Sequence, residues 1–258
     1  MEIRVDKKEN VLFFAKILAT ILVGFLLWVI SYYGDKKAGN PETPVLAIIL
    51  VMFNYLLIIA LMMFFNKIFL VGYLKGNGIE ISENQFPDFY RIYCEMSEQL
   101  EIKKRPPLFI IQQGGSLNAF AIRFSGKNYI ALYSDLFEVI ENDVDAVKFV
   151  VAHELGHVKR HHMTKQFWTI FGSLIPFLGP AYSRSCEYTC DNIGKDLSGS
   201  GAENALLVLA AGKALYGKVD ADKYIERARC NRSFSVKFSE LLASHPYLPN
   251  RIKNINKL

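Results

Sequence analysis

Two long apolar stretches near the N-terminus constrain the fold of this chain most. Residues 11–33 carry a single charge, Lys16, and residues 43–66 carry none. At about 1.5 Å of rise per residue, a helix of either length crosses a hydrocarbon core of roughly 30 Å. The sequence therefore predicts a membrane anchor over residues 1–67, with transmembrane helices at about 11–33 and 44–65.

The first apolar stretch is expected to be retained, because residues 31–35 lack the small-x-small pattern of a signal-peptide cleavage site. The alternative for either stretch is a buried helix of a globular core. An uncharged run of more than about 18 residues argues against that alternative. The mean hydropathy of +0.16 agrees with a membrane protein.

Basic residues near the two stretches predict the orientation, because cytoplasmic loops carry an excess of Lys and Arg. Arg4, Lys7 and Lys8 precede the first stretch and Lys16 lies near its start, while Lys67 and Lys75 follow the second stretch. Only Lys36 and Lys37 lie between the two stretches. We therefore expect a multi-pass protein of the cell (inner) membrane. The N-terminus and the domain that follows the anchor would both be cytoplasmic.

Residues 68–258 are expected to form one domain that is mainly α with a small antiparallel β-sheet, an α+β fold. β-Branched and aromatic runs predict three strands, at residues 108–111, 117–124 and 129–133, and a turn over residues 125–128 makes the last two a hairpin. Apolar residues spaced by three and four predict helices at about 82–105, 143–172, 182–197, 203–216 and 220–243.

The segment from Phe167 to Ala181 is apolar but is interrupted by glycines and prolines. It is too short for a transmembrane hairpin. Two interpretations stay open: a helix end and loop that touch the membrane surface or the core, or an ordinary hydrophobic loop.

Charge and cysteines limit the remaining classes of function. The net charge of +5 is modest and is not gathered in a dense basic run, so we expect no nucleic-acid partner; attraction to anionic lipid headgroups accounts for it better. Cys186 and Cys190 lie four residues apart in a predicted helix, where a disulfide would be strained, and Cys94 and Cys230 show no framework spacing. All four are expected to be reduced.

The sequence His153-Glu154-Leu155-Gly156-His157 lies inside an apolar-periodic helix. Histidines four residues apart lie one helical turn apart on nearly the same face, so both imidazoles can bind one ion at about 2.0–2.1 Å. Glu154 projects beside that ion, where a carboxylate can take a proton from a metal-activated water. The pattern predicts one zinc ion per chain, with His153 and His157 as ligands and Glu154 as general base.

A catalytic zinc needs a third protein ligand and leaves one position open for water. His161 and His162 follow closely, but continuing the helix turns them away from His153, so they are expected to form a solvated, basic helix end. Glu187 is the better candidate, on a separate helix with Asp191 one turn later. Asp191 would hydrogen-bond the far nitrogen of a ligand histidine and fix its tautomer.

Four motifs occur in the order in which they occur in HtpX-type membrane metallopeptidases, the family that also includes the CAAX prenyl proteases. They are Asn118-Ala119-Phe120-Ala121, the histidine motif, Ser183 to Asp191, and Ser244-His245-Pro246 with Arg251-Ile252. The chain resembles this family from about Gly76 to the C-terminus. The resemblance implies a zincin fold of the gluzincin type, with zinc held by His153, His157 and Glu187.

The resemblance also implies roles for the other motifs. Asn118, Ala119, Phe120 and Ala121 would form an edge strand that pairs with an extended peptide substrate. His245 would lie over the site and donate to the developing oxyanion, and Arg251 would be a structural ion-pair partner. Cys190 stands where family members usually have alanine, so a thiol is expected near the metal as a small buried residue.

These patterns together predict a membrane-anchored zinc endopeptidase, residues 68–258 being its catalytic domain. Its substrates would be polypeptides, either membrane proteins or misfolded proteins presented as extended chain. Two alternatives belong to other classes: a non-catalytic membrane scaffold in which zinc only staples two helices, and a zinc hydrolase of a non-peptide substrate. Glu154 argues against the scaffold, because a structural zinc site has no need of a general base.

Overall fold

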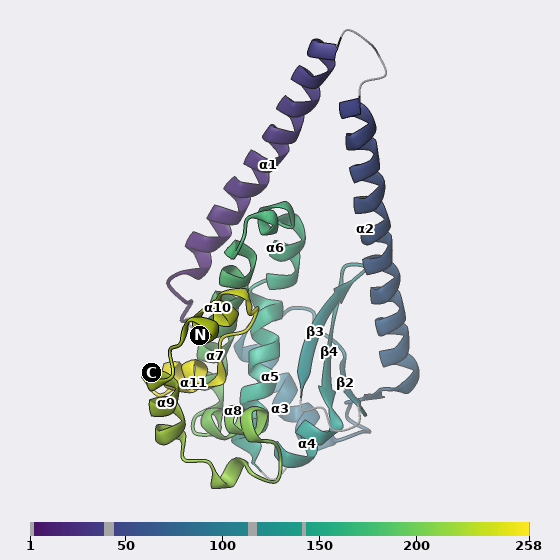
Figure 1. Ribbon diagram of the computed structural model, residues 1–258. Coiled ribbons are helices and arrows are strands. Elements are labelled where there is room, and N and C mark those ends of the chain that lie inside the picture. The colour runs from purple at the N-terminus through teal and green to yellow at the C-terminus, as the bar shows by residue number, and fades with distance from the viewer. Residues whose placement is uncertain (1–2, 39–43, 113–117, 141–142, 258) are drawn as a thin grey trace.

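The computed structural model describes residues 3–38, 44–112, 118–140 and 143–257. Two long helices, α1 (Glu9–Ala38) and α2 (Pro44–Asn77), extend from one end of a mainly helical domain (Figure 1). Their most apolar parts, Glu9–Ile30 and Phe53–Asn77, are 22 and 25 residues long. Each is long enough to cross a bilayer.

The side chains of α1 and α2 argue against burial in a globular core. Only 11% of the apolar window of α1 and 6% of that of α2 is buried, and most of their large apolar side chains are exposed. The first turns of α1 lie against the domain, and the last turns of α2 run down along the sheet (Figure 1). Two helices long and apolar enough to span a membrane are therefore present where the sequence predicted them.

The domain contains one four-stranded sheet, in the order β1-β2-β4-β3. Its strands are β1 (Ile79–Glu80), β2 (Leu108–Ile111), β3 (Ala119–Phe124) and β4 (Lys127–Tyr133). The predicted hairpin is confirmed, since β3 and β4 pair antiparallel, although residue 117 lies outside the described residues. Among the described residues β3 is an edge strand, with one side unpaired.

The prediction of an antiparallel sheet is wrong for one pairing, because β2 runs parallel to β4 and the sheet is mixed. All four residues of β2 are buried. A strand covered on both faces is typical of parallel pairing, which the hairpin pattern alone could not predict. The short stretch at residues 79–81 adds β1 as a fourth strand, antiparallel to β2.

Helices make up most of the rest of the domain. Their bounds are α3 (Pro87–Gln99), α4 (Ser134–Ile140), α5 (Val144–Lys159), α6 (His162–Trp168), the 3₁₀ helix η1 (Phe171–Leu174), α7 (Leu178–Ser198), α8 (Ala202–Ala211), the 3₁₀ helix η2 (Tyr216–Lys218), α9 (Ala221–Cys230), α10 (Phe234–Leu242) and α11 (Leu248–Ile255). The helix expected over 220–243 is two helices, and α4 and α11 were not predicted.

The single helix predicted over residues 143–172 is also wrong. It begins as expected, because Asp143 caps α5 by accepting a hydrogen bond from the backbone N–H of Ala146. It ends at Lys159, since His161 takes a left-handed conformation with φ of 55° and α6 starts in a new direction. This break determines where the histidines after the motif point.

Helices α5 and α7 pack closely at the centre of the domain, and two glycines allow the approach. A Cβ on Gly194 of α7 would lie 2.8 Å from two ring atoms of Phe149 on α5, and one on Gly156 would lie 3.1 Å from the sulfur of Cys190. The buried apolar core surrounds this contact and includes Val151 and Leu155, both wholly buried. Side chains on the facing surfaces of α5 and α7 are thereby brought together.

Candidate active site

The two motif histidines lie one turn apart on α5 and face a carboxylate on α7. Nε2 of His153 lies 3.4 Å from Oε2 of Glu187, and Nε2 of His157 lies 3.3 Å from Oε1 of the same side chain. Donors about 2.0–2.1 Å from one tetrahedral ion are about 3.3–3.4 Å from each other. The three side chains are close enough to share one zinc ion, with each histidine facing a different oxygen of the carboxylate.

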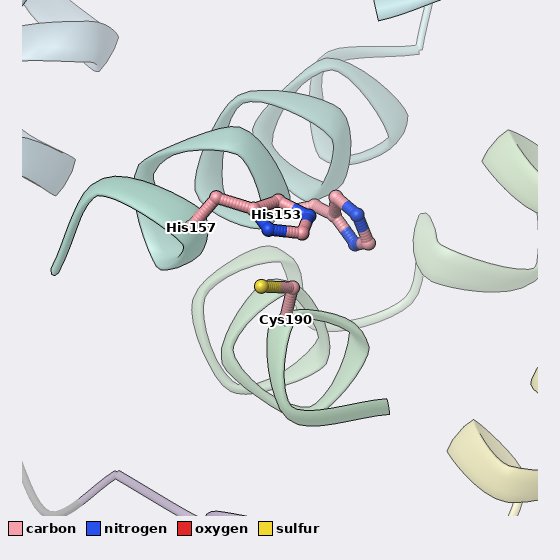
Figure 2. A group of neighbouring side chains, drawn as sticks. All are labelled: His153, His157 and Cys190. Carbon is pink, nitrogen blue, oxygen red and sulfur yellow. The ribbon is translucent and has the colours of Figure 1, made fainter. Parts of the chain in front are cut away.

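Cys190 is a second candidate for the third ligand. Its Sγ and one ring nitrogen from each of His153 and His157 all lie within 4.8 Å of one another. Figure 2 shows the two imidazoles on α5 and the thiol on α7, at the face where these helices meet. Either the Glu187 carboxylate or the Cys190 sulfur could therefore be the third ligand beside the two histidines.

The contacts of the histidines favour Glu187 over Cys190. Nε2 of each histidine lies 3.3–3.4 Å from one oxygen of the Glu187 carboxylate. Burial and then the negative charge of Glu187 raise the pKa of the Cys190 thiol well above its ordinary value. Cys190 lies against Gly156, which is consistent with a small buried residue.

The carboxylate of Asp191 fixes the tautomer of His153 through the ring nitrogen that faces away from Glu187. Nδ1 of His153 lies 3.0 Å from Oδ1 of Asp191, a wholly buried carboxylate. Arg251 holds that carboxylate with two hydrogen bonds, from Nε to Oδ2 at 2.8 Å and from Nη2 to Oδ1 at 2.6 Å. A proton on Nδ1 leaves the Nε2 lone pair of His153 directed at the Glu187 side.

Glu154 lines the same pocket as the two histidines and is buried. Burial raises the pKa of its carboxyl above the ordinary value, against the opposite effect of His153 and His157. A buried carboxylate beside a metal site, with a raised pKa, has the properties of a general base.

The pocket has a volume of about 340 Å³ and includes the predicted peptide-binding residues. Its wall contains Asn118, Ala119, Phe120 and Ala121, at the start of the edge strand β3. His245 also lines it, and Nδ1 of His245 lies 3.0 Å from Oε2 of Glu187. The hydrogen bond to Glu187 raises the pKa of His245 although partial burial opposes it. The predicted ligands, general base and peptide-binding residues thus border one cavity together with His245 and Arg251, and Asp191 stands directly behind His153.

The expectation that His161 and His162 are both solvated is wrong for His162. His161 is exposed, but the break after α5 turns His162 inward, where it is 1% exposed. Nδ1 of His162 lies 3.1 Å from Nδ1 of His157, and Nε2 lies 3.3 Å from Oε1 of Glu9 on α1. Burial lowers the pKa of His162 to about 4.

Sequence reasoning missed both His162 and Glu9. Helical periodicity turns His162 away from the site, and only the left-handed residue His161 reverses this. Glu9 comes from the anchor, some 150 positions earlier in the chain, so no local pattern connects it with the histidines.

An α-helix carrying His-Glu-x-x-His, opposed by a carboxylate from a second helix, is the arrangement of a metallopeptidase site. The chain belongs to peptidase family M48, whose model matches residues 83–179 and 165–258. This confirms the resemblance to the family of HtpX-type metallopeptidases.

Individual relatives agree with the family. The chain is 27% identical over 176 residues to plastoglobule-localized metallopeptidase 48 of Arabidopsis thaliana, covering 60% of this chain and 49% of that protein. It is 24% identical over 260 residues to a protease HtpX homolog of Helicobacter pylori strain Shi470, covering 83% of this chain and 81% of that protein. The chain thus spans about half the length of the first relative and four fifths of the second.

A comparison with solved structures finds the crystal structure of Ste24p from S. mikatae. The alignment covers 98% of this chain and 67% of that one, with a TM-score of 0.47 and 17% sequence identity.

Proposed function

We propose that this chain is a zinc-dependent endopeptidase, with residues 1–67 as its membrane anchor and residues 68–258 as its catalytic domain. The observation that carries the proposal is the meeting of the Glu187 carboxylate with the Nε2 atoms of His153 and His157 at 3.3–3.4 Å. Family M48 supports a metal-dependent peptidase, and the donor set of two imidazoles and one carboxylate supports zinc.

Each side chain then has a distinct task in peptide hydrolysis. Zinc, when bound by His153, His157 and Glu187, polarises the scissile carbonyl and acidifies the attacking water. Glu154 accepts the proton from that water and delivers it to the leaving amine nitrogen as the C–N bond breaks. His245, whose Nδ1 lies 3.0 Å from Oε2 of Glu187, would donate from Nε2–H to the developing oxyanion.

The substrate would bind as extended chain. Strand β3 has an unpaired edge among the described residues, and its first residues border the pocket. A peptide that pairs with this edge gains backbone hydrogen bonds irrespective of its sequence, which suits membrane or misfolded proteins as substrates.

The variant Glu154→Gln tests the catalytic assignment. It should retain about one zinc per chain and lose cleavage of an unfolded model protein by a factor of about 10²–10⁴, because the proton acceptor is gone but the ligands remain. Glu138→Gln, at an exposed glutamate remote from the pocket, is the matched control and should cleave normally.

The same assays separate the alternatives. If the wild type binds zinc but cleaves nothing, the chain is the non-catalytic scaffold in which zinc staples two helices. If the wild type cleaves small esters or amides but no polypeptide, the chain is a zinc hydrolase of a non-peptide substrate. Unchanged proteolysis by Glu154→Gln would remove Glu154 as the base.

The proposed location is the cell (inner) membrane, with the domain on the cytoplasmic side. It rests on the excess of basic residues on the outer sides of the two apolar stretches, residues 11–33 and 43–66, over Lys36 and Lys37 between the stretches. A cysteine introduced at Lys37 should be labelled by an impermeant thiol reagent from outside the cell. Labelling only after the membrane is broken would invert the orientation.

A further inference from the structure

The segment between α5 and α7 carries seven large apolar side chains that are exposed. We call these residues the apolar cap; their exposed fractions run from 40% to 72%, and they are Phe167, Trp168, Ile170, Phe171, Leu174, Ile175 and Phe177. A run of this kind is unfavourable in water and marks an interaction surface. The cap belongs to the end of the domain from which α1 and α2 extend (Figure 1).

The cap is fixed to the membrane helix α1 by a backbone contact. The backbone N–H of Gly172 donates to Oγ1 of Thr20 at 2.9 Å. A Cβ on Gly172 would lie 2.3 Å from the carbonyl oxygen of Lys16, so only glycine allows η1 and α1 to approach this closely. One turn further, Ile21 and Leu22 of α1 are exposed. The cap is therefore continuous with the part of α1 that faces lipid.

We propose that the apolar cap inserts into the bilayer interface beside α1. The occupant of this surface is lipid, because the cap joins an exposed apolar helix that is long enough to span the membrane. A tryptophan among other aromatic and aliphatic side chains is the composition of an interfacial anchor.

The insertion also defines a substrate class, an inference that rests on the proposed peptidase function. Helix α6 joins the pocket to the cap: His162, Met163 and Gln166 line the active-site pocket. The last two residues of the helix, Phe167 and Trp168, are exposed and belong to the cap. The pocket is then about one helix diameter, roughly 10–12 Å, from the bilayer. At about 3.3 Å per extended residue, the cleaved bond would lie about three to four residues from the membrane surface. The enzyme would thus cleave membrane proteins where their chain leaves the bilayer.

Fluorescence tests the insertion without any need for activity. The chain has two tryptophans, so Trp28→Phe leaves Trp168 as the reporter in phosphatidylcholine nanodiscs. Lipids brominated near the headgroup should quench Trp168, and aqueous acrylamide should quench it weakly. Trp168→Phe is the matched control and reports Trp28 within α1, which more deeply brominated lipids should quench.

Two outcomes would overturn the insertion. Strong acrylamide quenching with no bromolipid quenching would place Trp168 in water. Protection from both quenchers would mean that protein covers the cap, either a second copy or another chain.

Cleavage assays test the substrate class separately. Leu174→Glu puts a charge into the cap and should slow cleavage of a single-span substrate in nanodiscs, while cleavage of a soluble unfolded protein stays unchanged. Moving the susceptible segment away from the membrane by a flexible linker should also reduce cleavage. Equal cleavage at every linker length would refute the substrate class, and absence of cleavage of both substrates would refute the peptidase proposal itself.

A different set of contacts carries a second inference, about the far nitrogen of His157. If Nε2 of His157 binds the metal, its proton is on Nδ1, which faces Nδ1 of His162 at 3.1 Å. His162 must accept there, so its own proton is on Nε2. This atom makes no hydrogen bond among the described residues, but it lies 3.3 Å from Oε1 of Glu9, an ion-pair distance. The sulfur of Cys190 is further from His162, at 3.7 Å.

The geometry points to Glu9, in the first turn of the membrane helix α1, as a positioning residue for His157. Arg160 holds the Glu9 carboxylate in place with hydrogen bonds from Nε at 3.2 Å and Nη2 at 2.8 Å. The negative charge of Glu9 faces Nε2 of His162 and favours the tautomer with its proton on that atom, which leaves Nδ1 of His162 free to accept from His157. The membrane anchor thereby contributes to the metal site of the domain.

Zinc affinity of the full chain in detergent, measured by competition with a chelator, tests this role. Glu9→Ala should weaken zinc binding about 10- to 100-fold, as loss of a group that orients a ligand does. Glu9→Gln keeps an oxygen that can accept from His162 and should recover part of that loss. Thr20→Val removes another contact between α1 and the domain, and should keep wild-type affinity.

The outcomes distinguish a specific role of Glu9 in orienting His157 from a general role of α1 in holding the domain together. Wild-type zinc affinity in Glu9→Ala would overturn the inference. Equal losses in Thr20→Val and Glu9→Ala would also overturn it, because they would show that α1 acts only by holding the domain together. If Glu9→Ala does not fold, His162→Gln decides instead: wild-type zinc affinity in that variant would refute the inference.

Discussion

Replacing Arg251 by methionine would strand a buried charge at the centre of the domain. Asp191 is wholly buried and Arg251 is 7% exposed, and two hydrogen bonds at 2.6 and 2.8 Å join them. Removing one partner of a buried ion pair costs about 3–5 kcal/mol, because the other charge remains without compensation. For a chain of this size each kcal/mol lowers the melting temperature by about 2–4 °C, so Arg251→Met should lower it by roughly 6–20 °C.

The assay is thermal unfolding of the detergent-solubilised, metal-stripped protein, which separates folding from zinc binding. Arg4→Met is the control, because Arg4 also pairs with an aspartate but its side chain is 46% exposed, and such pairs contribute about 0–1 kcal/mol. The double variant Arg251→Met/Asp191→Asn should recover much of the loss. The reasoning is refuted if Arg251→Met melts no lower than Arg4→Met.

Three further predictions concern the ligands, the helix contact and the metal. Glu187→Ala should lose zinc whereas Cys190→Ser keeps it, as metal analysis of the purified variants would show. The reverse result would identify the Cys190 sulfur as the third ligand. Gly194→Ala should destabilise the protein by about 1–3 kcal/mol, because its Cβ would overlap the ring of Phe149, whereas Gly217→Ala, with open space around it, should melt like the wild type. Zinc at 100 times its Kd should stabilise the stripped protein by about 2.7 kcal/mol, and an unchanged melting temperature would exclude a specific site.

The sequence predicted the parts of this molecule that depend on local pattern. Uncharged length identified α1 and α2, and the hairpin of β3 and β4 followed from its turn residues. The histidine motif is helical because apolar residues recur around it, and spacing alone placed both imidazoles on one face. The carboxylate of Glu187 could be proposed because its helix also carries Asp191, which the structure places against His153.

What the sequence could not predict depends on single backbone torsions and on distant packing. The left-handed conformation of His161 ends the motif helix and buries His162, although helical periodicity indicates the opposite. Glu9 meets His162 only because α1 packs on α7 before it leaves the domain. The parallel pairing of β2 with β4 is a long-range choice that strand patterns do not encode.

X-ray absorption at the zinc edge of the full-length wild-type protein tests the site most directly, because it distinguishes oxygen and nitrogen ligands from sulfur. Ligation by His153, His157 and Glu187 predicts a first shell of nitrogen and oxygen alone, at about 2.0–2.1 Å. A scatterer at about 2.3 Å would be the sulfur of Cys190, and would contradict the ligand set on which the proposed chemistry depends.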